Sequence, residues 1–408
     1  MPHLVFVSME NCDEIWRRNQ FLVSELAQRY PESKILFVGT PQDVTHGVRE
    51  GNLTPLREAL SPQKLRNPQT EVPLPNVFLL NPPKWLPKTL PFGRRLNDHI
   101  QYRAIRKACA QLKMESPLLW LNAHYAVDLV GNLGESGVIY DVTDDWSQLA
   151  QSDLDKRLTV AQDAELCRKA DAVIVCSERL YELKQKLSDN VTLIPNGVDA
   201  AHYAPVLDEK EKPLPSIAAH WEKPVYGYTG TIHPDRVDVG LIEGIAKRMT
   251  QGTLALVGPT LLTEQDMGRL LKTGRVVFTG GVSYNVLPEI MRAFDVCMTP
   301  HLVTPFTESL NPIKLWEYLA AGKPIVSTPV AGFRDYPQFV ACAKNADDFF
   351  DALRIAEKEP EAKQRERRHV VAEQSWHNRV DQVEKVIAPY VTAMKTEAHL
   401  QKLSHPLC

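Results

Sequence analysis

Short apolar runs alternate with helical patterns along most of this chain, and this alternation constrains the fold more than any other feature. An unbroken apolar run is typical of a parallel strand buried on both faces. In the first half of the chain, the runs are Leu4–Val7, Ile35–Val38, Val77–Leu80, Leu118–Leu121, Val138–Tyr140, Ala172–Val175 and Val191–Ile194. The amphipathic segments between them include Phe21–Arg29, Asp98–Gln111 and Asp153–Lys169. Repeated strand–helix units predict an α/β fold with a doubly wound sheet.

A second series of the same kind follows a stretch rich in proline and charge that ends near Pro224. Its predicted strands are Tyr226–Tyr228, Thr253–Val257, Arg275–Thr279, Val296–Thr299, Ile325–Ser327 and Phe339–Ala343. Because a chain of 408 residues is long for one domain, we predict two. The expected boundaries are residues 1–200 for the N-terminal domain, 201–375 for the C-terminal domain, and 376–408 for a last helix and tail.

The composition argues against several classes of protein. A net charge of −3 argues against general nucleic-acid binding. The seven cysteines are scattered singly, without zinc-site spacing, which indicates a reducing compartment and no structural metal. No signal peptide is visible, and no apolar run approaches the length that a membrane-spanning helix needs. We therefore expect a cytoplasmic protein.

A helix expected to begin at Asn311-Pro312 and to end at Gly322 carries the strongest indication of function. The start of a helix presents unpaired N–H groups that can hold a phosphate, and Lys314 adds a positive charge one turn in. Glu317 lies three residues further on the same face, where its carboxylate could bind a pair of sugar hydroxyls. The alternative is an ordinary short helix with solvated surface charges.

The string from Glu317 to Val326 resembles the donor-site motif of the group 1 glycosyltransferases, a family with the GT-B fold. The resemblance implies two Rossmann-like lobes that face a cleft, with a C-terminal helix that could cross back to the first lobe. It implies that Glu317 binds the ribose hydroxyls, while Lys314, Asn311 and the backbone at Leu310 face the diphosphate. Such proteins move a sugar from a nucleoside diphosphate, such as UDP, to a hydroxyl acceptor without a cofactor or bound metal.

The Asn-Pro-x-Lys variant in this segment resembles a branch of the family that is associated with cell-surface polysaccharides. We therefore expect polysaccharide or glycolipid synthesis, with retention of configuration by family analogy. Lys314 is the predicted catalytic charge beside the leaving diphosphate. One position departs from the family: Ser309 stands eight residues before Glu317, where the common pattern has a glutamate near the transferred sugar.

The turns after two strands of the second series are further candidates for the donor site. Gly230 and Thr231 follow the first strand, where the family faces the donor phosphates, and Gly258 follows the second, where the base often docks. An ordinary tight turn is an equal alternative at Gly230. Arg236 is available nearby, although its spacing does not match the family's Arg/Lys pair. His301 could line the donor loop.

Polar residues near the strand ends of the first half are candidates for the acceptor side. Arg18 and Gln20 belong to a segment that resembles a helix start of the same branch. A solvated basic helix start is the alternative, because arginine is unfavourable at that end of a helix. Both residues are predicted to approach the acceptor.

Two later strands of the first half also end in polar residues. Asn122 and Asp144 are predicted on the acceptor side, because α/β sheets bind ligands at this edge. His124 is predicted to be catalytic and could bind an acceptor hydroxyl or a phosphate; a capped loop histidine is the alternative. The pair Asp144-Asp145 is interpreted as polar groups of the cleft or helix caps, and no metal site is predicted.

Residues 84–113 contain eight basic side chains and one acid, Asp98, with Trp85, Leu86, Leu90 and Phe92 interleaved. This composition suits contact with an anionic membrane surface, or with the phosphates of a lipid-linked acceptor. A solvated basic face is the alternative. The prediction is a cytoplasmic protein that could lie peripherally at the inner membrane face.

Two other functions compete with glycosyl transfer. A catalytically silent relative could bind a nucleotide or glycan within a biosynthetic complex, and the departure at Ser309 favours it. A GT-B-like epimerase or phosphorylase is the third alternative, although no sequence context suggests the lysine-bound cofactor of such phosphorylases. Turnover of a nucleotide sugar would discriminate among these functions.

Overall fold

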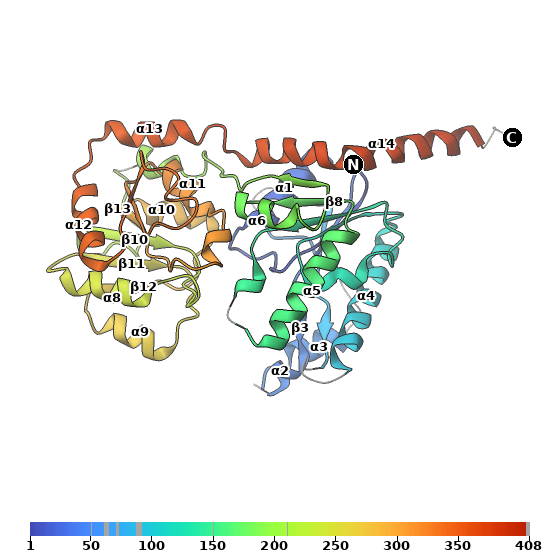
Figure 1. The fold of residues 1–408 in the computed structure, drawn as a ribbon, viewed down its shortest axis with the longest axis horizontal. Coiled ribbons are helices and arrows are strands. Elements are labelled where there is room, and N and C mark those ends of the chain that lie inside the picture. Colours follow the sequence, from blue (N-terminus) through green and yellow to red (C-terminus); the bar gives the residue numbers. More distant parts are fainter. Residues whose placement is uncertain are drawn as a thin grey trace. The chain divides into compact units, whose positions relative to one another are not determined.

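The computed structural model describes residues 1–49, 51–60, 65–70, 73–86, 92–149, 151–209 and 211–404. The chain divides into two compact units (Figure 1). The first lobe consists of Met1–Thr143, Ser152–Ile194 and Val380–Cys408. The second lobe consists of Asp144–Gln151 and Pro195–Arg379. The main division therefore falls a few residues before the boundary predicted at residue 200.

The first lobe is built on a seven-stranded sheet in the order β4-β2-β1-β6-β7-β8-β9. All its neighbouring strands pair in parallel. The strands are β1 Leu4–Val7, β2 Ile35–Val38, β4 Val77–Leu80, β6 Leu118–Leu121, β7 Gly137–Val142, β8 Ala172–Val175 and β9 Val191–Leu193. The predicted doubly wound α/β architecture is confirmed.

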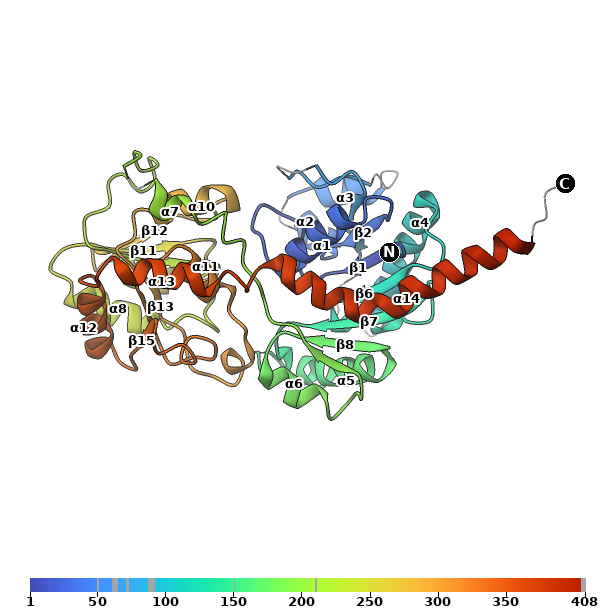
Figure 2. The same ribbon diagram turned by 90° about the horizontal axis from the view of Figure 1, so that it is seen from above.

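Successive residues of each strand point to opposite faces of this sheet. Val5 and Val7 pack into a core with Ile105 and Leu166 from helices α4 (Gly93–Leu112) and α5 (Asp153–Lys169). On the other face, the Phe6 ring stacks between Phe37 and Trp120, with ring centroids 5.6 and 5.5 Å apart. Helices α1 (Arg18–Arg29) and α14 (Trp376–Ser404) lie on that side (Figure 2).

Smaller elements complete the first lobe. They are a β3–β5 pair (Gln42–Asp43 and Pro83–Lys84), helices α2 (Val44–Arg49), α3 (Thr54–Leu60) and α6 (Glu178–Lys184), and the 3-10 helix η1 (His124–Leu129). Within the described ranges, no helix is both long enough and apolar enough to cross a bilayer.

The second lobe is built on a six-stranded parallel sheet in the order β12-β11-β10-β13-β14-β15. The strands are β10 Val225–Thr229, β11 Thr253–Val257, β12 Val276–Phe278, β13 Val296–Thr299, β14 Ile325–Ser327 and β15 Val340–Cys342. The helices are α7 Pro205–Asp208, α8 Val239–Arg248, α9 Glu264–Leu271, α10 Leu287–Met291, α11 Ile313–Ala320, α12 Ala346–Ala356 and α13 Ala362–Val370. The 3-10 helices are η2 Trp146–Gln148, η3 Tyr284–Val286 and η4 Thr307–Ser309.

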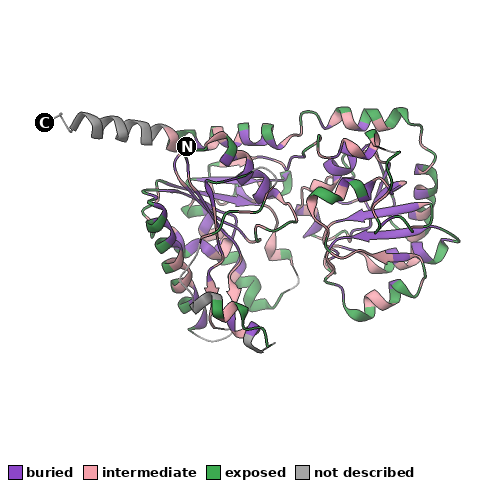
Figure 3. Ribbon diagram, turned by 180° about the vertical axis from the view of Figure 1, so that it is seen from behind, coloured by how far each residue is buried: buried purple, intermediate pink, exposed green. Residues whose placement is uncertain are grey.

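Two apolar clusters cover the two faces of the second sheet. Ala255 and Val257 belong to one cluster, whereas Leu254 and Leu256 belong to the other, as the alternation along a strand requires. The central strands β10, β11, β13 and β14 are buried along their whole length, and the exposed positions lie mainly on helices and loops (Figure 3).

The last helix belongs to both units. α14 begins at Trp376 in the second lobe, and the chain from Val380 onward belongs to the first lobe. There Asp381 accepts a hydrogen bond of 2.6 Å from Arg29 of α1, and Glu384 accepts one of 2.8 Å from Tyr30. The helix occupies Trp376–Ser404 of the segment 376–408, which was predicted to hold a last helix and tail.

Candidate functional site

The helix predicted to begin at Asn311-Pro312 begins at Ile313. Helix α11 has Pro312 in the N-cap position, and no side chain caps it. The side-chain oxygen of Asn311 instead accepts a hydrogen bond of 2.9 Å from the backbone N–H of Asn196. The helix ends at Ala320, and Gly322 has a φ of +68°, as the predicted stop requires.

Lys314, in the first turn of α11, lies against the turn that follows β10. A methyl group on Gly230 would lie 2.5 Å from the Cε atom of Lys314 and 2.7 Å from its ammonium nitrogen. The same nitrogen is 5.4 Å from the centroid of the Tyr228 ring. The structure thus brings Lys314 and Gly230 together at the carboxyl end of β10, although 84 positions separate them in the sequence.

Gly258, after β11, packs backbone to backbone with Gly230. A methyl group on Gly258 would lie 2.3 Å from the Gly230 carbonyl oxygen. Both glycines have positive φ, +113° at Gly230 and +141° at Gly258, which other residues rarely adopt. The result is a floor of bare backbone beneath an ammonium group, an arrangement that suits close approach of a phosphate.

Glu317, one turn after Lys314, is buried, with 9% of its surface exposed. Its carboxylate accepts a hydrogen bond of 2.8 Å from the hydroxyl of Tyr203. Burial raises the pKa of the Glu317 carboxyl, while the bond from Tyr203 and the charge of Lys314 lower it in part. Burial also raises the pKa of Tyr203 well above its ordinary value, so this phenol stays a hydrogen-bond donor.

Aromatic rings support Tyr203. The His202 ring stacks on Tyr284 with centroids 3.8 Å apart, and the Tyr203 ring stands edge-on to both. The sequence did not point to His202 and Tyr203, because they fall in the stretch rich in proline and charge that ends near Pro224. A dipeptide of two aromatic residues in such a stretch was the available signal.

His301, which was predicted to line the donor loop, is buried beside Tyr228. Its Nε2 atom lies 3.2 Å from the Tyr228 hydroxyl oxygen. Burial lowers the pKa of His301 well below its ordinary value, and the charges of Lys314 and Arg236 lower it further. The imidazole is therefore neutral at neutral pH. The hydroxyl of Tyr228 also donates to the carbonyl oxygen of Thr231 at 3.2 Å.

Arg236 lies at the edge of this group. Its guanidinium is 5.3 Å from the centroid of the Phe306 ring and 3.8 Å from the carboxylate of Asp144. Asp144 thus belongs to the second lobe and contacts a predicted donor residue, whereas the sequence placed it on the acceptor side. The neighbouring Asp145 caps η2 by accepting from the N–H of Ser147, which confirms its interpretation as a helix cap.

Ser309, which stands where the family has a glutamate, is fully buried. Its hydroxyl donates to the carbonyl oxygen of Phe306 at 2.7 Å and accepts from the N–H of Asp145 at 3.1 Å. The adjacent Glu308 pairs with Arg334 at 2.6 Å. The side chain at position 309 therefore ties the loop before α11 to the segment that follows β7.

Three predicted acceptor residues are engaged inside the first lobe. Buried Arg18 donates to both carboxylate oxygens of Asp141 at 3.1–3.2 Å and to the carbonyl oxygen of Ile194 at 3.0 Å. Asn122 donates to the carbonyl oxygen of Asp141 at 2.9 Å, and Gln20 accepts from the N–H of Arg17 at 3.1 Å. The bonds of Arg18 join the strand ends to the start of α1, and contact of these three residues with an acceptor stays a prediction.

His124, predicted as catalytic, is the first residue of η1 and is half-buried, with its ring edge-on to Tyr125. It belongs to the first lobe, whereas Lys314 belongs to the second. The second lobe also contains Leu310 and Asn311, which were predicted beside Lys314 at the diphosphate. Of the predicted donor residues, Gly230, Gly258, Lys314 and Glu317 form one group.

Comparison with known proteins agrees with this geometry. Residues 223–357 match the family described as "Glycosyl transferases group 1". The matched residues all lie in the second lobe. They include Gly230, Gly258, Lys314 and Glu317, which form the group described above.

A relative known from sequence covers part of the chain. TuaH of Bacillus subtilis (strain 168), named for a glycosyltransferase role in teichuronic acid biosynthesis, is 30% identical over 203 residues. The match covers 47% of this chain, and this chain spans about half the length of that relative (50%).

Solved structures match nearly the whole chain. Sucrose-phosphate synthase from Thermosynechococcus elongatus has a TM-score of 0.66 at 16% identity, covering 96% of this chain and 100% of that one. Anabaena HepE, solved with UDP and glucose, has a TM-score of 0.66 at 13% identity, covering 95% and 100%. At such identities the likeness establishes the fold, which is GT-B.

Proposed function

We propose that this protein is a glycosyltransferase that moves a sugar from a nucleoside diphosphate to a hydroxyl acceptor. One observation carries the proposal: Lys314, the glycine floor and Glu317 meet at the carboxyl ends of β10 and β11. Parallel α/β sheets bind ligands at this edge. The ammonium and the bare backbone fit a diphosphate, and the buried carboxylate fits the two hydroxyls of a ribose.

In this proposal, the second lobe acts mainly by positioning and by charge. Glu317 holds the ribose, so that the diphosphate lies over Gly230 within reach of Lys314. As the bond to the sugar breaks, negative charge grows on the leaving diphosphate, and the Lys314 ammonium stabilises it. Asn311 and the backbone at Leu310 would contact the same phosphates. No cofactor or metal enters the proposal, and retention of configuration follows the family resemblance.

We propose UDP as the nucleotide and an acceptor in polysaccharide or glycolipid synthesis. HepE was solved with UDP and glucose, and TuaH is named for a role in teichuronic acid biosynthesis. His124 would act on the acceptor hydroxyl from the first lobe.

A thermal-shift series with UDP, GDP, ADP and their glucose conjugates tests the donor. A ligand that binds the folded state raises the melting temperature with the logarithm of its saturation. UDP and UDP-glucose should stabilise the protein most, and Glu317→Ala should remove the shift while the variant stays folded. No shift with any of these nucleotides would overturn the proposal.

The burial of Ser309 favours a second candidate function, a silent relative that binds a nucleotide sugar without transferring it. Where the family places a glutamate near the sugar, this chain has a hydroxyl committed to internal bonds. A transferase releases UDP from UDP-glucose as it transfers the glucose to water or to an added glycoside. Measuring this release separates the two functions. Binding without any release would favour the silent relative.

We further propose peripheral contact with a membrane on the cytoplasmic side. Phe92 and Leu96, at the start of α4, are 76% and 46% exposed. Further along the helix, Arg103, Arg106 and Lys107 are exposed as well. Residues 87–91 and the side chain of Arg94, which the prediction includes, lie outside the described part of the chain. Exposed apolar side chains at the start of the helix, together with exposed cations, suit an anionic lipid surface.

A further inference from the structure

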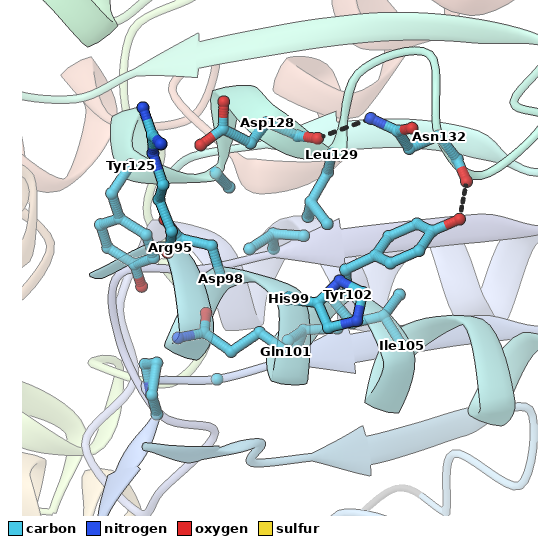
Figure 4. Close-up of a pocket in the computed structure, with 15 residues that line it drawn as sticks. Arg95, Asp98, His99, Gln101, Tyr102, Ile105, Tyr125, Asp128, Leu129 and Asn132 are labelled. Carbon is cyan, nitrogen blue, oxygen red and sulfur yellow. Dashed lines mark hydrogen bonds between the residues drawn. The ribbon is translucent and has the colours of Figure 1, made fainter. Parts of the chain in front are cut away.

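A cavity of about 480 Å³ lies in the first lobe at the carboxyl ends of β1 and β2. Helix α4 forms one wall, and η1 with the residues that follow it forms another (Figure 4). Val7, Val38 and Leu129 contribute apolar surface. The volume falls within the range of about 300–1,000 Å³ that is usual for small-molecule sites. The four residues predicted on the acceptor side do not line this cavity, whereas part of the basic segment 84–113, predicted for a lipid surface or a lipid-linked acceptor, does.

Tyr102 of α4 forms a fixed aromatic wall of the cavity. Its hydroxyl donates to the carbonyl oxygen of Asn132 at 2.7 Å and accepts from Arg106 at 3.1 Å. Asn132 in turn donates from its side chain to the carbonyl oxygen of Asp128 at 2.8 Å (Figure 4). Because these hydrogen bonds hold the ring before a ligand arrives, binding costs little side-chain entropy at Tyr102.

The charged side chains that line the cavity are two carboxylates and one guanidinium, beside the imidazole of His99. Asp98 of α4 and Asp128 of η1 come from different walls, and Arg95 is the lining guanidinium. Gln101 adds an amide, and Tyr125 adds a second aromatic ring. Carboxylates and amides bind hydroxyl groups well, whereas two carboxylates oppose the entry of an anionic ligand.

We infer that this cavity binds a neutral, polyhydroxylated ring, that is, a hexose-type unit without a carboxylate or phosphate of its own. The aromatic wall would cover the apolar face of the ring, and the carboxylates and amide would bind its hydroxyls. The assignment of this sugar as the acceptor rests on the proposed function. The binding itself rests on the cavity alone.

Ligand-observed NMR titration tests the inference with methyl α-D-glucopyranoside, methyl β-D-galactopyranoside and glucuronic acid. At least one neutral glycoside should bind, and glucuronic acid should bind about tenfold more weakly or worse. Asp128→Asn should weaken binding of the neutral glycoside about tenfold, the scale of a hydrogen bond to a charged group. Tyr102→Ala should weaken it by about the same factor, because it removes the aromatic wall. Tyr102→Phe keeps the ring and should retain most of the binding, which separates loss of the wall from loss of the fold.

Arg157→Gln is the matched control, because Arg157 is an exposed residue of α5 in the same lobe that does not line the cavity. It should leave glycoside binding unchanged. Tighter binding of glucuronic acid than of the neutral glycosides would overturn the inference. So would the absence of neutral-glycoside binding at millimolar concentration, or binding that ignores both Asp128→Asn and Tyr102→Ala.

UDP affinity, measured on the same samples, separates this inference from the proposed function. The cavity variants should leave UDP binding unchanged, because the proposed nucleotide residues all belong to the second lobe. UDP binding without glycoside binding would remove the inference and leave the proposed function. Glycoside binding that depends on Tyr102, without UDP binding, would support the inference and remove the proposed function.

Discussion

The hydroxyl of Tyr203 donates a hydrogen bond of 2.8 Å to the carboxylate of Glu317. Both side chains are buried, and the rings of His202 and Tyr284 stand around the phenol. One carboxylate oxygen is therefore fixed before any ligand arrives. A group oriented in advance loses less freedom on binding, so we assign Tyr203 a positioning role for Glu317.

Removal of the Tyr203 hydroxyl should weaken the donor without unfolding the lobe. In Tyr203→Phe, we expect UDP to bind about tenfold more weakly, the scale of a hydrogen bond to a charged group. The pKa of Glu317 should also rise further, because this bond lowers it. Calorimetric titration of UDP across pH measures both effects.

Tyr226→Phe is a matched control for that experiment. Tyr226 lies in β10 of the same lobe, and its hydroxyl also donates to a glutamate, Glu357. This change removes a comparable bond away from the site, so UDP affinity and its pH profile should stay as in the wild type. Equal losses in both variants would show a general effect of destabilisation and would remove the positioning role.

Glu317→Gln should weaken UDP binding yet raise stability at neutral pH. The pKa of the Glu317 carboxyl is higher in the folded protein than in the unfolded chain, because burial disfavours its charge. Glu317 therefore contributes its full stabilisation at pH values below its pKa in the unfolded chain. This contribution is lost as the pH rises through its pKa in the folded protein. We therefore expect Glu317→Gln to melt higher than the wild type at pH 7, with the difference shrinking toward pH 4.

The same carboxylate gives donor binding a pH dependence. UDP affinity of the wild type should fall as the pH drops through the raised pKa of Glu317, since a protonated carboxyl binds the ribose hydroxyls less well. Glu317→Gln should show weaker binding with a flatter profile. A wild-type profile as flat as that of the variant would contradict the assignment of Glu317 to the ribose.

Lys314→Met should affect turnover more than folding. This change keeps the length of the side chain and removes the charge beside the Gly230 floor, so we expect transfer from UDP-glucose to fall about 100-fold or more. Lys247→Met on α8 is the control, because that lysine is exposed and pairs with Glu243 at 2.8 Å. A Lys314→Met rate near that of the control would place Lys314 outside the reaction.

The start of α4 should determine binding to anionic vesicles. We expect co-sedimentation to rise with the anionic lipid fraction and to fall with salt, because each basic residue near the surface contributes about 1 kcal/mol that ions screen. The double change Phe92→Ser and Leu96→Ser should reduce it. Leu154→Ser removes another exposed apolar group of the first lobe, 70% exposed on α5, and should have no effect. Vesicle binding that is absent at low salt would remove the membrane proposal.

The architecture was predictable from the sequence because parallel strands are buried on both faces and therefore appear as unbroken apolar runs. The spacing of Lys314 and Glu317 on one helix was predictable for a similar reason, since both belong to one local element. Tyr203 was not predictable in this way, because its partner Glu317 is 114 positions away. Only the fold brings these two residues together.

The first-lobe residues illustrate a different limit of sequence analysis. Arg18 and Asn122 do lie near strand ends, as their positions in the sequence suggested. The sequence could not show that Asp141, fully buried, needs a cationic partner and that Arg18 supplies it. Polar residues at the edge of a sheet can serve the protein's own interior as well as a ligand.

The segment Asp144–Gln151 belongs to the second lobe although first-lobe chain lies on both sides of it. The backbone therefore changes lobes four times, after Thr143, Gln151, Ile194 and Arg379. A chimera that replaces only the residues from Pro195 onward would remove Ser309 while keeping Asp145, whose amide donates to the Ser309 hydroxyl. Exchange of donor specificity between two such proteins would require transplanting the short segment together with the large one, at all four junctions.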